Sequence, residues 1–330
     1  MAIEAAAPSV NPLTGQPYSQ TLAPELERLL AAQRLGGPKI DRYALPFPQS
    51  RQALVDERRR TRGTPLAMHE VHDEVLVVGN RTVGLRWFLA NEECRSRTPL
   101  IYLHGGGWCV GSNETHDTVL RHLASATRMP VCGVDYALAP EHPFPAALDD
   151  VRAVTDMVLA RNASSGLPRQ VAMAGDSAGA TLAIGEALRR RDAGLGGDIA
   201  ALVLFYGVFT TPRASGSFAA YGDGRFGLSL HAHARYLDAY LPPSVRDDPR
   251  AFPLHAKLTG MPPTYLLAAE LDPLFDESVE MHRAMAAASS PAELAIAPGM
   301  PHGFLNQANG LPQAAQALRD SAAFIQRMLG

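Results

Sequence analysis

Short apolar runs alternate with longer amphipathic segments along most of the chain. The apolar runs have the length of buried strands, and turn residues bound them. They cover residues 75–78, 83–89, 99–103, 131–134, 170–173, 201–205, 264–269 and 293–297. The amphipathic segments predict helices at residues 24–32, 115–127, 146–159, 178–190, 230–241, 277–287 and 312–329. This alternation predicts an α/β fold, in which a mostly parallel eight-stranded sheet is covered by helices on both faces.

Two parts of the chain interrupt this alternation. Residues 1–65 mix prolines with one helical stretch, and residues 206–253 are rich in Gly, Ser, Pro and aromatic residues. The remaining residues, 66–205 and 254–330, then form the core domain. We expect 206–253 to be an insertion over the strand ends, where α/β sheets bind their ligands. A merely structural excursion is the alternative.

The composition is that of an ordinary globular protein, with 46% hydrophobic and 19% charged residues. The net charge is −3, and no run of Lys or Arg lies on an aromatic-rich face, so nucleic acid is not an expected partner. The one basic cluster, RRRTR at residues 58–62, directly follows Asp56 and Glu57. Acids beside a short basic run favour a solvated helix end there.

The cysteines and the first residues bear on where the protein works. Cys94, Cys109 and Cys132 are an odd number without metal-type spacing, so they predict free thiols in a reducing compartment. The first residues carry no basic region and no long apolar stretch, and no segment holds about 18 uninterrupted apolar residues. We therefore expect a soluble, cytoplasmic protein without a membrane span.

A serine stands between the strand at 170–173 and the helix at 178–190. Gly175 and Gly179 flank Ser177 with the Gly-x-Ser-x-Gly spacing of a nucleophile elbow, in which small residues permit a sharp strand-to-helix turn. The following helix directs its free N–H groups toward the serine oxygen. A Gly-, Ser- and Ala-rich turn without chemistry is the alternative for this segment alone.

Three consecutive glycines follow the strand at 99–103. Gly105, Gly106 and Gly107 cost conformational entropy and add no packing, so they favour a loop whose backbone N–H groups approach a developing oxyanion. A flexible loop is the alternative. We expect His104, directly before the glycines, to hold the shape of the loop rather than to transfer protons.

A serine nucleophile needs a base and an acid that orients the base. His302 stands out among 11 histidines because it lies in a turn-rich loop directly after the last predicted strand. Asp272 follows the preceding strand and is favoured as the acid by its loop position and by Pro273. Glu270 and Asp276 are the competing acids, and we expect Asp276 to cap the following helix.

Together these motifs resemble the hormone-sensitive lipase family of α/β-hydrolases, the bacterial esterases with an HGGG motif. The matching segments, which run from about residue 70 to the C-terminus, are HGGGW at 104–108, GDSAG at 175–179, DPL at 272–274, HGF at 302–304 and DYALAPEHPFPAA at 135–147. Two positions depart from the family pattern. Ala137 replaces a usual arginine, which predicts looser packing of that loop, and Ala180 replaces a common glycine.

The resemblance implies an α/β-hydrolase fold with a helical cap built from residues 1–65 and 206–253. It implies a nucleophile at Ser177, an acid at Asp272 and a base at His302. The implied oxyanion donors are the N–H groups of Gly106, Gly107 and Ala178, with a supporting loop of His104, Gly105, Trp108 and Asp176. The resemblance also suggests a homodimer, formed through the edge strand at 293–297.

The sequence thus predicts a carboxylic ester hydrolase that forms an acyl-enzyme, needs no metal or organic cofactor, and acts on short- to medium-chain acyl esters. Its partner would be a small-molecule ester. An amidase or formamidase with the same triad is the first alternative. A non-catalytic ligand-binding relative is the second, although such a relative would be expected to have lost part of the triad.

Overall fold

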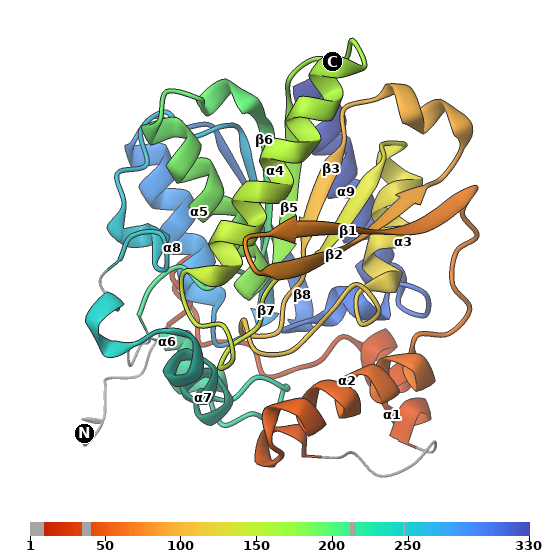
Figure 1. Ribbon diagram of the computed structural model, residues 1–330. Coiled ribbons are helices and arrows are strands. Elements are labelled where there is room, and N and C mark those ends of the chain that lie inside the picture. Colours follow the sequence, from red (N-terminus) through yellow and green to blue (C-terminus); the bar gives the residue numbers. More distant parts are fainter. Residues whose placement is uncertain (1–9, 35–40, 212–215, 247) are drawn as a thin grey trace.

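The computed structural model describes residues 10–34, 41–211, 216–246 and 248–330. It contains one eight-stranded sheet with the strand order β1-β2-β4-β3-β5-β6-β7-β8 (Figure 1). The strands are β1 (Glu70–Val78), β2 (Arg81–Leu89), β3 (Leu100–Leu103), β4 (Val131–Asp135), β5 (Val171–Asp176), β6 (Ile199–Phe205), β7 (Thr264–Leu271) and β8 (Ala292–Pro301). Each predicted apolar run forms one of these strands, so the prediction of an eight-stranded sheet is confirmed.

The sheet is parallel except around β2. Strands β1 and β2 form a hairpin across the predicted turn Gly79–Asn80, and β2 is also antiparallel to β4. All pairs from β4 to β8 are parallel. Because parallel strands end at the same edge of a sheet, the loops that follow β3, β5, β7 and β8 emerge on one side of the molecule.

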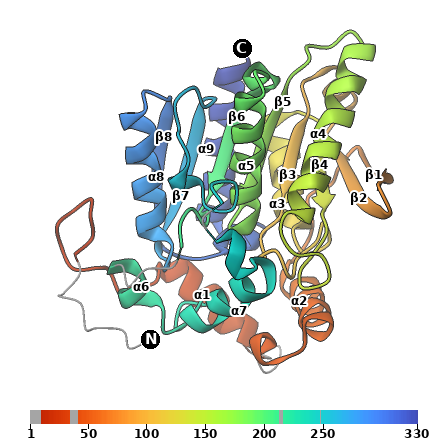
Figure 2. The ribbon, with the colours of Figure 1, turned by 60° about the vertical axis from the view of Figure 1, so that its left-hand side comes forward.

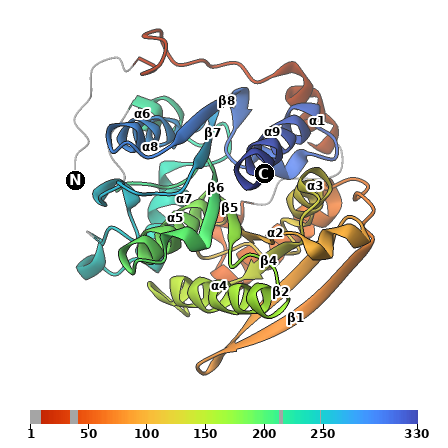
Figure 3. The same cartoon turned by 90° about the horizontal axis from the view of Figure 1, so that it is seen from above.

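Helices cover both faces of the sheet (Figure 3). Helices α4 (Ala146–Ser164), α5 (Ala178–Asp192) and α8 (Phe275–Ala287) lie on one face, and α3 (Asp117–Thr127) and α9 (Pro312–Leu329) lie on the other. The side chains of β3 alternate between the two cores. Ile101 and Leu103 pack on the α4 side, while Leu100 and Tyr102 pack on the α3 side.

A third group of helices lies beyond one end of the sheet (Figure 2). It consists of α1 (Pro24–Arg34), α2 (Phe47–Thr61), α6 (Gly216–Tyr221) and α7 (Leu230–Tyr240). These helices come from the two segments that interrupt the alternation of strands and helices. The sequence predicted α1 and α7 but gave no range for α2 or α6.

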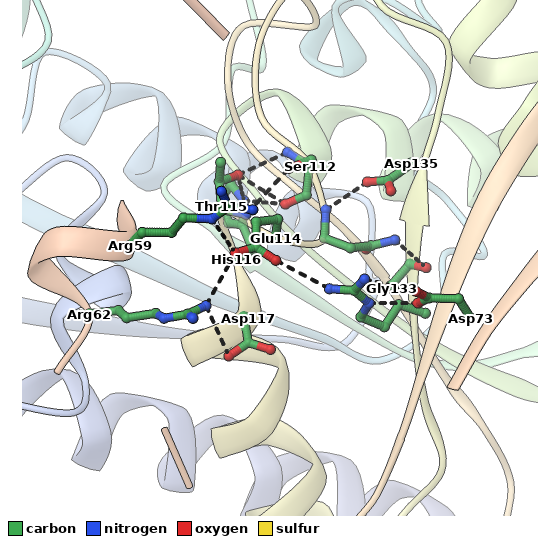
Figure 4. A network of polar contacts seen from close by, with 12 residues as sticks. Arg59, Arg62, Asp73, Ser112, Glu114, Thr115, His116, Asp117, Gly133 and Asp135 are labelled. Carbon is green, nitrogen blue, oxygen red and sulfur yellow. Dashed lines mark hydrogen bonds and ion pairs between the residues drawn. The ribbon is translucent and has the colours of Figure 1, made fainter. Parts of the chain in front are cut away.

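Helix α2 is tied to the core at both of its ends. Arg51 donates to the carbonyl oxygens of Cys109 and Ala139, each at 2.8 Å. Near the other end, Arg59 and Arg62 donate to Glu114, whose second carboxylate oxygen accepts from Arg86 (Figure 4). The helix is therefore held across the loops that follow β3 and β4.

Candidate active site

Ser177 occupies the turn between β5 and α5 with a backbone conformation that side chains rarely adopt. Its φ is 53° and its ψ is −122°, and its N–H donates to Phe205 O at 2.9 Å. A Cβ added at Gly179 would lie 1.9 Å from Leu103 O, and one added at Gly175 would lie 2.4 Å from the backbone of Gly179. Only glycine permits this close approach of strand and helix, which is the physical reason for the motif.

Three side chains from three different strand ends line up at this turn. Oγ of Ser177 lies 2.9 Å from Nε2 of His302, and Nδ1 of His302 lies 2.7 Å from Oδ2 of Asp272. These are hydrogen-bond distances, so a proton can pass from the serine to the imidazole while the carboxylate holds the ring. Residues separated by up to 125 positions in the sequence are thus brought into direct contact.

The surroundings of His302 favour its charged form. Burial alone would lower the pKa of His302, but the negative charge of Asp272 and its hydrogen bond raise that pKa above the ordinary 6.5. Asp272 is fully buried, and its second oxygen accepts from the N–H of Leu274 at 2.9 Å. The ring of Tyr206 covers the imidazole edge-on, with ring centroids 4.9 Å apart.

The two competing acids lie elsewhere. Glu270 accepts a hydrogen bond from the N–H of Gly299. Asp276 was expected to cap α8, but Leu274 occupies the cap position and Asp276 lies in the first turn of the helix. Its carboxylate instead accepts from the hydroxyl of Tyr18 at 2.8 Å and from the N–H of Ser217 at 3.0 Å.

The glycine loop lies against the serine turn with free backbone donors. Among the residues that the structure describes, none accepts a hydrogen bond from the N–H groups of Gly106, Gly107 or Ala178. Gly106 and Gly107 have φ values of 127° and 58°. A Cβ at Gly107 would also lie 2.3 Å from the ring of Tyr236 in α7. These N–H groups are therefore available to a ligand at Ser177.

Asp176 holds the glycine loop through hydrogen bonds to its buried carboxylate. Its Oδ1 accepts from the N–H of Gly105 and from the hydroxyl of Tyr102, both at 2.7 Å, and lies 3.4 Å from Nε2 of His116. Burial would raise the pKa of Asp176, but His116 and these donors lower it to about 2. A permanently charged carboxylate thus anchors the loop.

His104 and Trp108, at the two ends of the loop, also have structural contacts. His104 stacks on Tyr136 with ring centroids 4.3 Å apart, and Tyr136 donates to His104 O at 2.6 Å. Burial lowers the pKa of His104 to about 3, so it stays neutral. Trp108 is buried and stacks on Tyr240 at 4.5 Å. These contacts support the view that His104 shapes the loop.

The loop that contains Ala137, where the family usually has arginine, is held by other groups. The N–H of Ala137 donates to one oxygen of Asp150 at 2.9 Å, and Arg81 donates to the other oxygen at 2.7 Å. A guanidinium from β2 is therefore present next to this position. Ala180, the second departure, is fully buried in the first turn of α5.

Sequence reasoning missed two buried polar side chains, one on α2 and one on α7. Arg58 was expected on a solvated helix end, but only 16% of its side chain is exposed, whereas Arg59 and Arg60 are exposed as expected. His233 on α7 is also buried, and within the described ranges neither of its ring nitrogens has a hydrogen-bond partner. Burial lowers the pKa of His233 to about 4. The spacing of Arg51, Leu54 and Arg58 along one helical face was the available signal for Arg58.

Three further observations concern the cysteines, metal binding and membrane-spanning helices. Cys94, Cys109 and Cys132 are free and buried. Over the described part of the chain, no three His, Cys, Asp or Glu side chains are placed to hold a metal ion together. None of the described helices combines the length and apolar character that a membrane crossing requires.

Comparisons with known proteins agree with this architecture. A family model described as alpha/beta hydrolase fold matches residues 100–306. The solved structure of the ester-hydrolase EH1AB1 from the metagenome of Lake Arreo, complexed with a derivative of bipyridine phosphonate, is 34% identical, with a TM-score of 0.83 over 92% of this chain and 98% of that one. An alpha/beta-hydrolase enzyme from the same metagenome, solved as a serine-to-alanine mutant, is 32% identical, with a TM-score of 0.84 over 93% and 98%. The esterase of Pyrobaculum calidifontis is 29% identical, with a TM-score of 0.84 over 94% and 100%. The chain therefore belongs to the α/β-hydrolase family that its motifs resemble, the hormone-sensitive-lipase-like esterases.

Proposed function

We propose that this protein hydrolyses carboxylic esters with Ser177 as nucleophile, His302 as base and Asp272 as the acid that orients the base. The observation that carries the proposal is the continuous line of hydrogen bonds from Ser177 through His302 to Asp272, next to backbone donors without partners. Several similar solved structures are named esterases or ester hydrolases, which supports the ester as the bond that is cleaved.

The proposed reaction follows from the positions of these groups. Ser177 Oγ attacks the ester carbonyl carbon while its proton passes to Nε2 of His302, and Asp272 stabilises the resulting imidazolium. The carbonyl oxygen becomes negative and accepts from the N–H groups of Gly106, Gly107 and Ala178. The imidazolium then protonates the departing alkoxide, which leaves an acyl group on Ser177. A water molecule repeats these steps, releases the acid and restores the serine.

The capping segments provide the basis for a proposal about substrate size. Helices α1 and α2 from residues 1–65 and α6 and α7 from residues 206–253 lie over the end of the sheet where Ser177 sits (Figure 2). We treat them as the cap and residues 66–205 and 254–330 as the catalytic core. Tyr236 of α7 lies directly over the glycine loop and limits the room there, which favours short- to medium-chain acyl esters.

Two further proposals concern the cellular compartment and the oligomeric state of the protein. The three buried free thiols support a reducing compartment such as the cytoplasm. Burial raises the pKa of Cys109 to about 12, so this thiol resists oxidation. Strand β8 is an outer strand of the sheet, which supports a homodimer formed by pairing of two such edges.

The proposal is tested with p-nitrophenyl esters from acetate to palmitate and with matched p-nitroanilides. We expect turnover of the short and medium esters and a loss of at least about a thousandfold in kcat for Ser177→Ala, because the nucleophile is gone. Faster cleavage of anilides would favour an amidase. Ligand binding without turnover of any ester or anilide by the unaltered protein would overturn the proposal in favour of a binding protein.

A further inference from the structure

Arg58 is a nearly buried cation that lacks a hydrogen-bond partner. Only 16% of its side chain is exposed, and its Nε is buried. No described residue accepts a hydrogen bond from its guanidinium. Its single ion pair joins Nη1 to Oε1 of Glu57 at 4.0 Å, the longest ion pair in the described structure. A cation withdrawn from water in this way costs free energy unless another group compensates it.

Glu57 cannot fully compensate Arg58, because it already serves Arg42. Nη1 of Arg42 donates to Oε2 of Glu57 at 3.1 Å, and only 20% of the Arg42 side chain is exposed. Two guanidinium groups therefore share one carboxylate. Burial lowers the pKa of Arg58, and the charge of Arg42 opposes the raising effect of Glu57, but an arginine stays charged at neutral pH. Asp176 adds a weaker attraction, so Arg58 has no carboxylate of its own.

Arg58 lies on the side of α2 that packs on the core near the glycine loop. Arg51, Leu54 and Arg58 follow one another at helical spacing, so they share one face of α2. Arg51 on this face donates to Cys109 O, just beyond the glycine loop, and Leu54 is buried. Burial raises the pKa of Tyr206 and the charge of Arg58 counteracts this rise, which puts Arg58 within electrostatic reach of the ring that lies against His302.

The position of Arg58 is fixed by its neighbours on α2. Arg59 and Arg62 are both held by Glu114 (Figure 4), and Arg51 is held by two carbonyl oxygens of the core. These anchors hold the helix that carries Arg58 and leave the guanidinium of Arg58 unused. A group held in place with unused donors is suited to bind a ligand.

We propose that Arg58 binds an anionic group of the substrate, so that the natural substrates are esters that carry a carboxylate as well as the ester bond. This inference rests on the proposed ester hydrolysis and adds the substrate class. An arginine pairs with a carboxylate through two parallel hydrogen bonds, and such charge-assisted bonds discriminate strongly against a neutral analogue. The net charge of −3 would repel an anion from the protein as a whole, so any preference for anionic esters must come from a local site.

The experiment compares two pairs of esters that differ mainly in charge. In one pair the charge is on the acyl part, with mono-p-nitrophenyl adipate against p-nitrophenyl hexanoate. In the other pair it is on the alcohol part, with 3-carboxyphenyl butyrate against phenyl butyrate. We expect the unaltered enzyme to show a KM about ten- to a hundredfold lower for the anionic member of at least one pair. Equal or higher KM values for the anionic members of both pairs would overturn the inference.

Variants of α2 assign the preference to Arg58. We expect the KM ratio between neutral and anionic members to fall toward one in Arg58→Gln and to be partly kept in Arg58→Lys, which retains the charge. Arg60→Gln is the matched control, since it removes the same charge from an exposed position of the same helix. A ratio that survives in Arg58→Gln would overturn the assignment. Turnover of the neutral esters without any preference would refute this inference alone, whereas no turnover of any ester would refute the proposed function.

Discussion

The pKa of a single side chain, His302, governs the acid limb of the proposed activity. Nε2 must be unprotonated to accept the proton of Ser177, and the charge of Asp272 raises the pKa of the imidazole above 6.5. We expect kcat/KM to fall as the pH drops through this raised pKa. A pH–rate profile with p-nitrophenyl butyrate measures the midpoint.

Asp272→Asn separates the effect of this carboxylate from that of burial. Without the negative charge, burial dominates, so the midpoint should move to lower pH. The rate at the plateau should fall by about 10³- to 10⁴-fold, because the amide no longer holds the imidazole in the required tautomer. A midpoint that stays in place would show that Asp272 does not set the pKa of His302.

The meeting of the three proposed triad residues could be predicted from the sequence, whereas the burial of Arg58 could not. Ser177, Asp272 and His302 each directly follow an apolar strand, and parallel strands end at a common edge, so local patterns located all three. The burial of Arg58 depends on how α2 folds back over the loop after β3, which local periodicity does not determine. Its neighbours in the sequence, Arg59 and Arg60, are exposed and made the whole cluster look solvated.

At the scale of elements, the close approach of β5 and α5 defines the serine turn. A Cβ at Gly179 would meet the backbone oxygen of Leu103 at 1.9 Å, and backbone cannot move aside as a side chain can. We expect Gly179→Ala to lower the free energy of unfolding by about 2–4 kcal/mol and to reduce kcat more than KM. Urea denaturation and ester kinetics measure both effects. Ala183→Gly, in the next turn of α5, is a control that lowers stability without adding an atom at the serine turn.

A buried carboxyl joins α8 to the segment after β6. Oε2 of Glu277 accepts from the N–H of Phe209 at 2.6 Å and of Thr210 at 3.0 Å, while Oε1 has no partner in the part of the chain that the structure describes. Burial raises the pKa of Glu277 from 4.5 to about 8, and the charge of Asp272 adds to this effect. The folded protein therefore holds a proton here that the unfolded chain releases above about pH 4.5.

The raised pKa of Glu277 makes the free energy of unfolding depend on pH. The contribution of Glu277 is fully present below pH 4.5 and is lost as the pH rises through about 8. Glu277→Gln keeps the acceptor oxygen but cannot ionise. We expect this variant to gain up to a few kcal/mol in the free energy of unfolding relative to the parent between pH 5 and pH 9, as measured by urea denaturation. Parallel pH dependence of the two proteins would contradict the raised pKa.

At the scale of the whole molecule, β8 is an outer strand of the described sheet. Its backbone donors and acceptors could pair with the same strand of a second copy, which would extend the sheet across a twofold axis. We expect sedimentation equilibrium to give twice the mass of one chain. A mass of one chain at micromolar concentration would show that this edge stays free.

The proposed catalytic groups and the groups that would contact the rest of the substrate lie on different parts of the fold. The proposed nucleophile, acid, base and oxyanion donors all follow strands of one sheet, whereas Arg58 and Tyr236 belong to helices outside that sheet. Substitutions in α2 or α7 can therefore change which molecules are accepted without moving the atoms that break the bond. New specificities can arise in this scaffold by exchange of two short segments, while its chemistry is inherited intact.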